Sequence, residues 1–164
     1  MRVTGMLAVM ACWAGVAAAQ TPTPACPDAP KTWQGARPVE AARNFGAHPH
    51  PDLTLGEPAD VALVPAEAMI LAAPLGRPVA PDDRGGLLGF HIALTGTYRV
   101  ALGGKAWIYV VRHGRSLPPA GHVHGEPCTG VVKQVDFTLA PGDYVLQLSA
   151  AATPHVSVLL SRLP

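Results

Sequence analysis

The clearest pattern in the chain is an alternation of apolar and small or polar residues that begins near its middle. Leu88, Phe90 and Ile92 are apolar, and Gly89 and His91 lie between them. A period of two is typical of a β-strand with one buried face. Further apolar segments follow at short intervals, separated by Gly and Pro turn residues: 98–102, 107–111, 131–139, 144–148 and 156–160. Because this half has no helical repeat of apolar residues, the pattern predicts an all-β domain.

The strand pattern occurs twice. Residues 90–102 (FHIALTGTYRVAL) match residues 137–148 (FTLAPGDYVLQL), with one residue of difference in the turn. On this alignment, Ile108 and Val110 correspond to Val156 and Val158. Two three-stranded units stacked face to face predict a small antiparallel β-sandwich, or a jelly-roll-like domain, with pseudo-twofold symmetry. The alternative is that the two segments are similar because both converged on a common hairpin sequence pattern. This alternative predicts the same architecture.

The first half of the chain is less regular. We expect residues 20–51 to form a Pro-rich irregular segment, with one possible helical turn at 39–44, and residues 52–164 to form the β-sandwich domain. Short apolar runs at 60–64 and 68–72 add strand character. Trp107 is expected in the core, with a ligand-facing aromatic as the alternative.

The first residues resemble a secretory signal peptide. Arg2 precedes the apolar run 6–16, and Ala17, Ala18 and Ala19 form a small-residue cleavage site, so residues 1–19 are expected to be removed. The apolar run is too short to span a bilayer, which takes about 20 residues. We therefore expect a periplasmic or secreted protein without a transmembrane segment. A lipoprotein anchored through Cys12 is the competing interpretation.

Signal cleavage would leave two cysteines, Cys26 and Cys128. In an oxidising compartment an isolated pair usually forms a disulfide. The competing interpretation makes Cys128 a thiolate ligand of a metal ion.

The charge balance argues against a nucleic-acid partner. The chain has 12 Lys and Arg against 11 Asp and Glu, and the signal segment contains one Arg and no acid. The expected mature chain therefore has 12 − 1 = 11 basic and 11 acidic residues, without a basic cluster.

The histidines are the best candidates for chemistry. His122 and His124 lie in the segment GHVHGEPC, and residues at i and i+2 share a face of an extended chain, so the two imidazoles could chelate one transition metal such as Cu, Zn or Fe. The further candidate ligands are Glu126, His113, His48 and His50. The plain alternative is a solvated loop, within residues 112–127, whose histidines bind nothing.

Catalytic motifs are absent from the sequence. It contains no G-x-S-x-G, P-loop, G-x-G-x-x-G or H-E-x-x-H. Asp82 and Asp83 lie in a Pro/Gly loop, where carboxylates usually cap a turn. We expect His91 at the surface, and Asp136 in a cross-strand pair with a Lys or Arg.

Residues 87–164 resemble a group of small secreted bacterial proteins. The resemblance lies in GTYRVAL (96–102), AWI (106–108), the loop His122-x-His124-Gly125-x-x-Cys128 and the strand segments 130–139 and 142–149, with Cys26 as the matching N-terminal feature. Some of these proteins carry the label homogentisate 1,2-dioxygenase, which implies a cupin barrel with a His/His/Glu iron site. The strand pattern also looks similar to sandwich domains appended to secreted peptidases, which resemble binding modules.

The sequence departs from the cupin pattern. In that pattern a Glu follows the H-x-H pair after three or four residues, whereas Glu126 follows His124 after one. The glycine expected six residues before His122 is Ser116, and no second cupin motif is found.

We therefore expect a periplasmic, non-catalytic β-sandwich that binds an envelope partner or a metal ion through the histidine-rich loop. The alternatives are a small metal-dependent oxygenase and a structural envelope protein.

Overall fold

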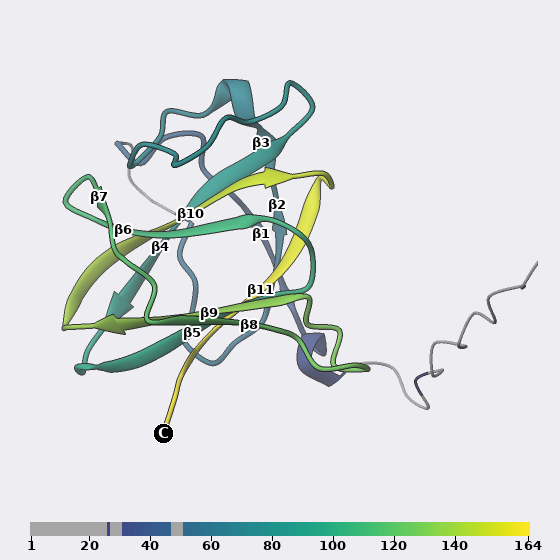
Figure 1. Ribbon diagram of the computed structural model, residues 1–164, viewed down its shortest axis with the longest axis vertical. Coiled ribbons are helices and arrows are strands. Elements are labelled where there is room, and N and C mark those ends of the chain that lie inside the picture. Colours follow the sequence, from purple (N-terminus) through teal and green to yellow (C-terminus); the bar gives the residue numbers. More distant parts are fainter. Residues whose placement is uncertain (1–25, 27–30, 47–50) are drawn as a thin grey trace, which may run out of the picture.

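The computed structural model describes Cys26, residues 31–46 and residues 51–164, and this part of the chain is a two-layered β-sandwich (Figure 1). The predicted all-β fold is confirmed. The predicted signal peptide, residues 1–19, lies outside the described residues. Within the described residues, no helix has the length and apolar character needed to cross a membrane.

One layer is a six-stranded sheet with the strand order β1-β2-β11-β5-β9-β8. All of its pairs are antiparallel except β1 with β2, which run parallel. Its strands are β1 (Arg37–Glu40), β2 (Ala59–Ala62), β5 (Gly96–Leu102), β8 (Gly121–His124), β9 (Lys133–Leu139) and β11 (His155–Arg162).

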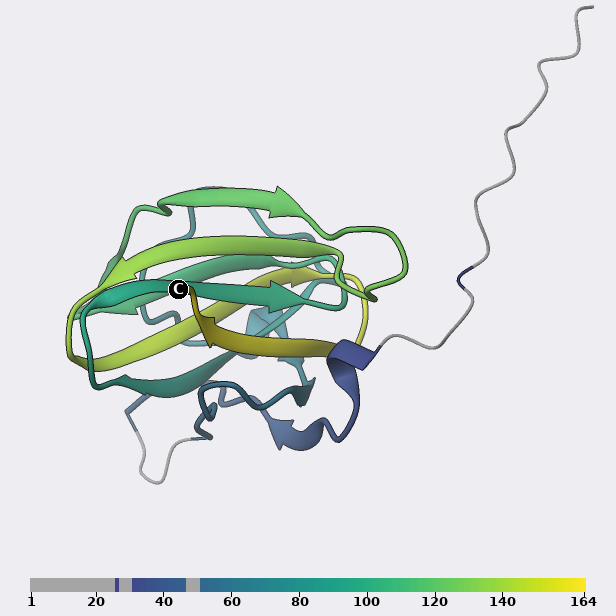
Figure 2. The ribbon, with the colours of Figure 1, turned by 90° about the horizontal axis from the view of Figure 1, so that it is seen from below.

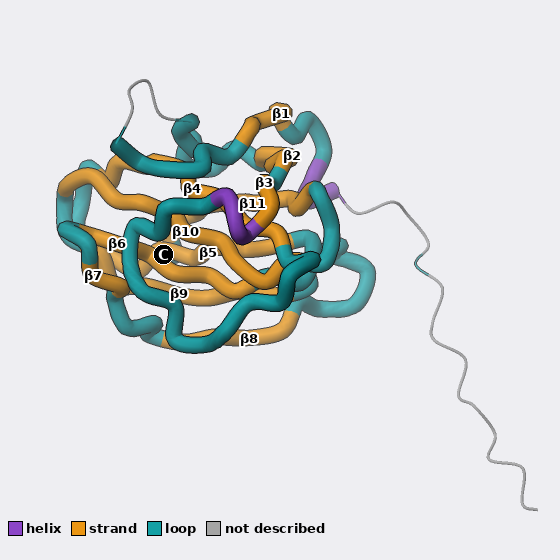
Figure 3. Tube along the Cα trace, turned by 90° about the horizontal axis from the view of Figure 1, so that it is seen from above, coloured by secondary structure: helices purple, strands orange, loops and turns teal. Residues whose placement is uncertain are grey.

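The other layer is a five-stranded antiparallel sheet with the order β3-β4-β10-β6-β7. Its strands are β3 (Val64–Pro65), β4 (Arg84–Ile92), β6 (Trp107–Arg112), β7 (Arg115–Ser116) and β10 (Gly142–Ala151). Figure 3 shows that strands dominate the molecule, with the short 3-10 helices η1 (Lys31–Trp33) and η2 (Ala66–Ala68).

The core lies between the two sheets and is formed by alternate residues of the long strands. Its buried side chains include Phe90, Tyr98, Val100, Phe137, Tyr144, Leu146 and Val158. The prediction for Trp107 is wrong, because this side chain is 38% exposed. Ile108 and Val110 take the inward positions of β6, so Trp107 starts the strand on the other face.

The two sequence copies are related, but they do not form one sheet each. The first copy places β4 and β6 in the five-stranded sheet and β5 in the other, whereas the second places β9 and β11 in the six-stranded sheet and β10 in the other. The central strands β11-β5-β9 of one sheet therefore correspond to β6-β10-β4 of the other. The expectation of two separate three-stranded layers is wrong, because each copy alternates between the sheets and pairs with the other copy.

Residue pairing supports the correspondence. Tyr98 lies opposite Phe137, and Tyr144 lies opposite Phe90. Each tyrosine hydroxyl donates a hydrogen bond of 2.7 Å to the carbonyl four residues before it, on Leu94 for Tyr98 and on Ala140 for Tyr144.

The last strands of the two copies align with a shift from the predicted register. Ile108 lies opposite Leu148, and Val158 lies opposite Leu102, so Ile108 corresponds to Val158 rather than to Val156. By the same shift, Val110 corresponds to Leu160 rather than to Val158. The displacement arises because β10 continues past Leu148 to Ala151 through a register irregularity, whereas β5 ends at Leu102, the residue equivalent to Leu148.

The N-terminal segment packs against β4 instead of forming a helical turn at residues 39–44. Val39 belongs to strand β1, and Ala42 forms a bridge with Leu87. A side chain at Gly89 would collide with Asp52 and contact Phe45, so glycine lets the crossing chain approach the outer face of β4. This covering segment explains why β4 is buried on both faces over most of its length.

Candidate functional site

A cleft of about 730 Å³ opens between the two sheets, beside the edge strand β8. Figure 2 shows β8 as the outermost strand on one side of the sandwich. Its inner wall is apolar and is formed by the buried side chains of Ala106, Ile108 and Val135. Its remaining lining residues are Lys105, Trp107, Pro119, His122, His124, Val132, Lys133 and Ala150.

The structure brings His122 and His124 together on this cleft. Both belong to β8, so the expectation that residues 112–127 form one long loop is wrong. His122 pairs with Val135 and His124 with Lys133, and these two β9 residues also line the cleft. The exposed Val123 between them lies on the other face of β8, as the period of two requires. The two histidines therefore share one face of β8, as their i, i+2 spacing predicts, while their role as metal ligands stays a prediction.

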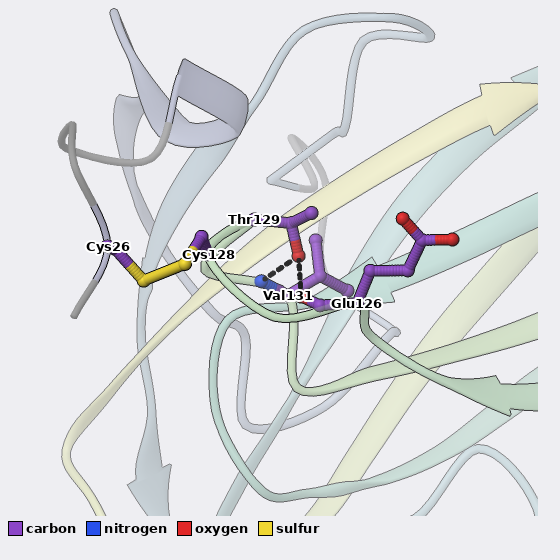
Figure 4. Close-up of a disulfide and its surroundings, with 5 residues drawn as sticks. All are labelled: Cys26, Glu126, Cys128, Thr129 and Val131. Carbon is purple, nitrogen blue, oxygen red and sulfur yellow. Dashed lines mark hydrogen bonds between the residues drawn. A yellow bond between two sulfur atoms is a disulfide. The ribbon is translucent and has the colours of Figure 1, made fainter. Parts of the chain in front are cut away.

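The connection from β8 to β9 is fixed by close backbone contacts. A side chain at Gly125 would collide with the carbonyl of Val131, so this position requires glycine. The Thr129 hydroxyl donates to the carbonyl of Glu126 at 2.7 Å and accepts from the Val131 amide at 3.2 Å (Figure 4). Gly130 has a φ of +70°, a conformation that glycine adopts readily.

The predicted Cys26–Cys128 disulfide is present and joins this connection to the N-terminal segment (Figure 4). Two further contacts lie beside it. Thr32 donates a hydrogen bond to the carbonyl of Thr129, and the indole of Trp33 donates to that of Gly130, each at 2.9 Å. The connection that follows the two histidines is therefore anchored covalently and through helix η1.

Two cations lie over the ring of Trp107. The Arg77 guanidinium is 3.8 Å from the ring centroid and the Lys133 ammonium is 4.3 Å from it. Cations are attracted to an indole face by the ring quadrupole, which accounts for both positions. The half-exposed indole at the rim of the cleft is thus in contact with two positively charged side chains.

Lys133 has no carboxylate partner among the residues that the structure describes. Its ammonium donates a long hydrogen bond of 3.4 Å to the carbonyl of Ala106. Burial lowers the pKa of the Lys133 ammonium below its ordinary value, and the neighbouring charge of Arg77 lowers this pKa further. In the part of the chain that the structure describes, neither cation forms an ion pair, and the cleft lining contains no Asp or Glu.

The other proposed metal ligands are not gathered at the cleft. Glu126 is exposed, points away from the disulfide (Figure 4), and lines a separate cavity of about 610 Å³ with Arg99 and Val123. His124 borders this second cavity as well as the cleft.

His113 lies at the far end of β6, about 20 Å from the cleft along the six residues of the strand. His113 and Gly114 have φ values of 50° and 72° and form a tight turn between β6 and β7, typical of a two-residue hairpin. His48 and His50 lie outside the described residues. Among the described residues, no group of three or more His, Cys, Asp or Glu is placed to hold a metal ion.

Two further polar side chains behave as the sequence predicts. Arg99 binds Asp136 through two hydrogen bonds of 2.7 and 2.8 Å, and these bonds raise the pKa of the guanidinium. His91 is exposed and lies 2.7 Å from Asp143 on the neighbouring strand. Both pairs stabilise strand pairing outside the cleft.

Sequence reasoning missed the cations Lys133 and Arg77. For Lys133 a signal exists, because Val135, Phe137 and Leu139 mark the inward positions of β9 and Lys133 continues the same period of two. A lysine at a core-facing position of a strand is unusual, and the side chain of Lys133 avoids full burial because it reaches the cleft. Arg77 carries no such signal, because it comes from an irregular segment whose path is set by tertiary contacts.

Comparison of the chain with protein-family models and with curated proteins finds no match. The resemblance to secreted H-x-H-G-x-x-C proteins therefore stays a prediction, and the function must be argued from the cleft itself.

Proposed function

We propose that the chain is an exported, non-catalytic binding module whose ligand site is the cleft between the sheets. One observation carries this proposal: both histidines of β8 border the same space as the buried apolar wall of Ala106, Ile108 and Val135. A volume of about 730 Å³ lies within the range of sites for small organic molecules. An apolar wall with a few polar groups at its rim is also typical of such sites.

Two features support export. The Cys26–Cys128 disulfide is compatible with an oxidising compartment outside the cytoplasm. The N-terminal sequence supplies the charged, apolar and small-residue segments of a signal peptide. We therefore place the protein in the periplasm or the secreted fraction.

The proposal is tested with a neutral fluorescent probe, N-phenylnaphthylamine, whose emission rises in an apolar site. We expect saturable binding to the folded protein, weakened about tenfold by Val132→Phe, because an aromatic ring at this rim position would fill part of the cleft. Val123→Phe is the matched control, since this exposed valine lies on the other face of β8. An affinity for the probe that Val132→Phe leaves unchanged, or no binding of the probe at all, would overturn the proposal.

A metal ion is the second candidate ligand, and the shared face of His122 and His124 favours it. Two imidazoles on adjacent inward positions could chelate Cu(II) or Zn(II), with water completing the coordination. Calorimetric titration of each metal into the untagged protein should show binding that His122→Ala/His124→Ala abolishes and that His155→Ala, on the exposed end of β11, leaves intact. Equal binding by all three proteins would contradict chelation in the cleft.

A further inference from the structure

Among the described residues, the polar lining of the cleft consists of lysines and histidines, without a carboxylate. Lys105, Lys133, His122 and His124 line it, and Arg77 lies over the ring of Trp107 at its rim. Positively charged or neutral side chains thus surround an apolar wall. Such a site favours an anionic ligand, because the lining residues described above include no Asp or Glu that would repel it.

The two cations at Trp107 are each attracted to the indole, but they are close enough for the charge of Arg77 to lower the pKa of Lys133. Like charges repel, and both Arg77 and Lys133 lie within 5 Å of one ring centroid, at 3.8 and 4.3 Å. The half-buried ammonium of Lys133 has lost part of its hydration and, within the described part of the chain, holds one long hydrogen bond, to the Ala106 carbonyl. An anionic group at the rim would complete the hydrogen bonding of Lys133 and reduce the repulsion between the two cations.

The position of the apolar wall defines the rest of the ligand. Ile108 and Val135 come from opposite sheets and lie deeper than the cations, since they are 8% and 6% exposed. A ligand that spans both regions therefore carries a flat or slender apolar body and one anionic end. Inorganic ions would reach the cations alone and would leave the apolar wall uncovered.

We propose that the cleft binds a small organic anion, with its apolar body between the two sheets and its charged end at Lys133, where the charge of Arg77 over the same indole adds to the attraction. This inference rests on the proposed function, because it specifies what the same cleft binds. It names a carboxylate, sulfonate or phosphate ester attached to an aromatic or aliphatic group.

The test compares two probes that differ in charge. Anilinonaphthalene sulfonate is the anionic counterpart of the neutral N-phenylnaphthylamine, and its fluorescence also rises in an apolar site. We expect the folded protein to bind the sulfonate about tenfold more tightly than the neutral probe, because charge-assisted hydrogen bonds add to the apolar contacts. The difference should shrink at about 1 M salt, where the Debye length falls to roughly 3 Å.

Variants locate the charge effect. Lys133→Met should weaken sulfonate binding about tenfold, more than it changes binding of the neutral probe, and Arg77→Met, outside the lining, should weaken sulfonate binding by about threefold. Arg43→Met is the matched control, since this exposed arginine neither lines the cleft nor lies over the Trp107 ring. Near-UV circular dichroism of each variant verifies folding, and Lys133→Gln replaces Lys133→Met if the latter fails to fold.

The outcomes separate the two proposals. Equal affinity for both probes, or sulfonate binding that survives both Lys133→Met and Arg77→Met, would overturn the anion assignment while the cleft remains a binding site. Failure of both probes, or neutral-probe binding unaffected by Val132→Phe, would overturn the binding module itself.

Discussion

Tyr98 and Tyr144 show how single residues stabilise the two equivalent corners of the sandwich. Each ring is buried in the core, and each hydroxyl reaches back to a carbonyl in the turn that precedes its strand. Arg162 donates to the carbonyl of Thr95 in one turn, at 3.2 Å, and Arg112 donates to that of Pro141 in the other, at 3.1 Å. The last strand of each copy therefore anchors the turn of the other copy.

We expect Tyr98→Phe to lower the free energy of unfolding by about 0.5–1.5 kcal/mol, the net contribution of one hydrogen bond. Tyr144→Phe should cost at least as much, because its hydroxyl also accepts a bond from Arg112 at 3.1 Å. Urea unfolding monitored by far-UV circular dichroism measures both values. A cost confined to one of the two tyrosines would contradict their equivalence.

Lys133 gives the site a pH signature. The pKa of its ammonium is lowered in the folded protein from the ordinary value of 10.5, so the unfolded state binds more protons between the folded pKa and 10.5. The free energy of unfolding therefore rises with pH through this alkaline window. Below the window, the charged ammonium of Lys133 destabilises the folded protein to its full extent. Lys133→Met should lose this component of the rise.

The measurement is the difference in unfolding free energy between wild type and Lys133→Met, followed by urea unfolding from neutral pH to about pH 10.5. Subtracting the two curves removes the titration of groups that both proteins share. Parallel curves would show that Lys133 is fully hydrated in the folded protein.

At the scale of elements, the irregular segment between β3 and β4 depends on one buried side chain of β10. Gln147 is 0% exposed, and its amide oxygen accepts from the backbone amides of Ala72 and Ala73 at 2.7 and 3.1 Å. Its amide nitrogen donates to the carbonyl of Ala73 at 3.0 Å. Because Arg77 follows four residues later, this anchor also helps to position the guanidinium over Trp107.

Gln147→Leu would leave these backbone groups without partners, at about 1–3 kcal/mol for each group that stays buried. We expect hydrogen exchange of the Ala72 and Ala73 amides to accelerate, while amides of the central strands keep most of their protection. The variant should also bind anilinonaphthalene sulfonate more weakly. Unchanged exchange at Ala72 and Ala73 would show that other contacts hold the segment.

The long strands could be predicted from the sequence because each alternates or forms a bounded apolar run. β5, β9 and β10 follow the predicted segments within a few residues. The short strands β7 and β8 could not be predicted, since their hydrogen bonds to β6 and β9 depend on tertiary pairing rather than on apolar pattern. The same holds for β1, whose paired residues in β2 lie 22 positions further along the sequence, as Arg37 and Ala59 do.

At the scale of the whole molecule, the two copies interlock instead of stacking. β5 pairs with β9 and β11, and β10 pairs with β4 and β6, so each copy completes the sheets of the other. The copies were recognisable in the sequence, but their division between the sheets was not. The period of two fixes which face of a strand is apolar, and it does not say which sheet receives the strand.

The candidate site was predictable only in part. His122 and His124 were correctly placed on one face because spacing alone decides this in an extended segment. The cleft, Arg77 and the exposed Trp107 depend on how two sheet edges and an irregular segment meet, and no local pattern encodes this.

The Cys26–Cys128 bond joins residues separated by 102 positions, so it closes most of the described chain. In the chain-entropy model such a loop stabilises the fold by about 4–5 kcal/mol, with measured values often lower. We expect reduction, or Cys26→Ala/Cys128→Ala, to lower the urea midpoint of unfolding. Two freely alkylated thiols in the unreduced protein would contradict the bond.

The central claim, that the cleft is the binding site, is tested most directly by the indole N–H signals in a two-dimensional NMR titration. Trp107 borders the cleft. The indole of Trp33 donates a hydrogen bond to the Gly130 carbonyl beside the disulfide and serves as an internal control. Trp107→Phe assigns the signal. Addition of anilinonaphthalene sulfonate should shift the Trp107 signal saturably and leave that of Trp33 in place. A Trp107 signal that stays fixed while the probe binds elsewhere would contradict the account.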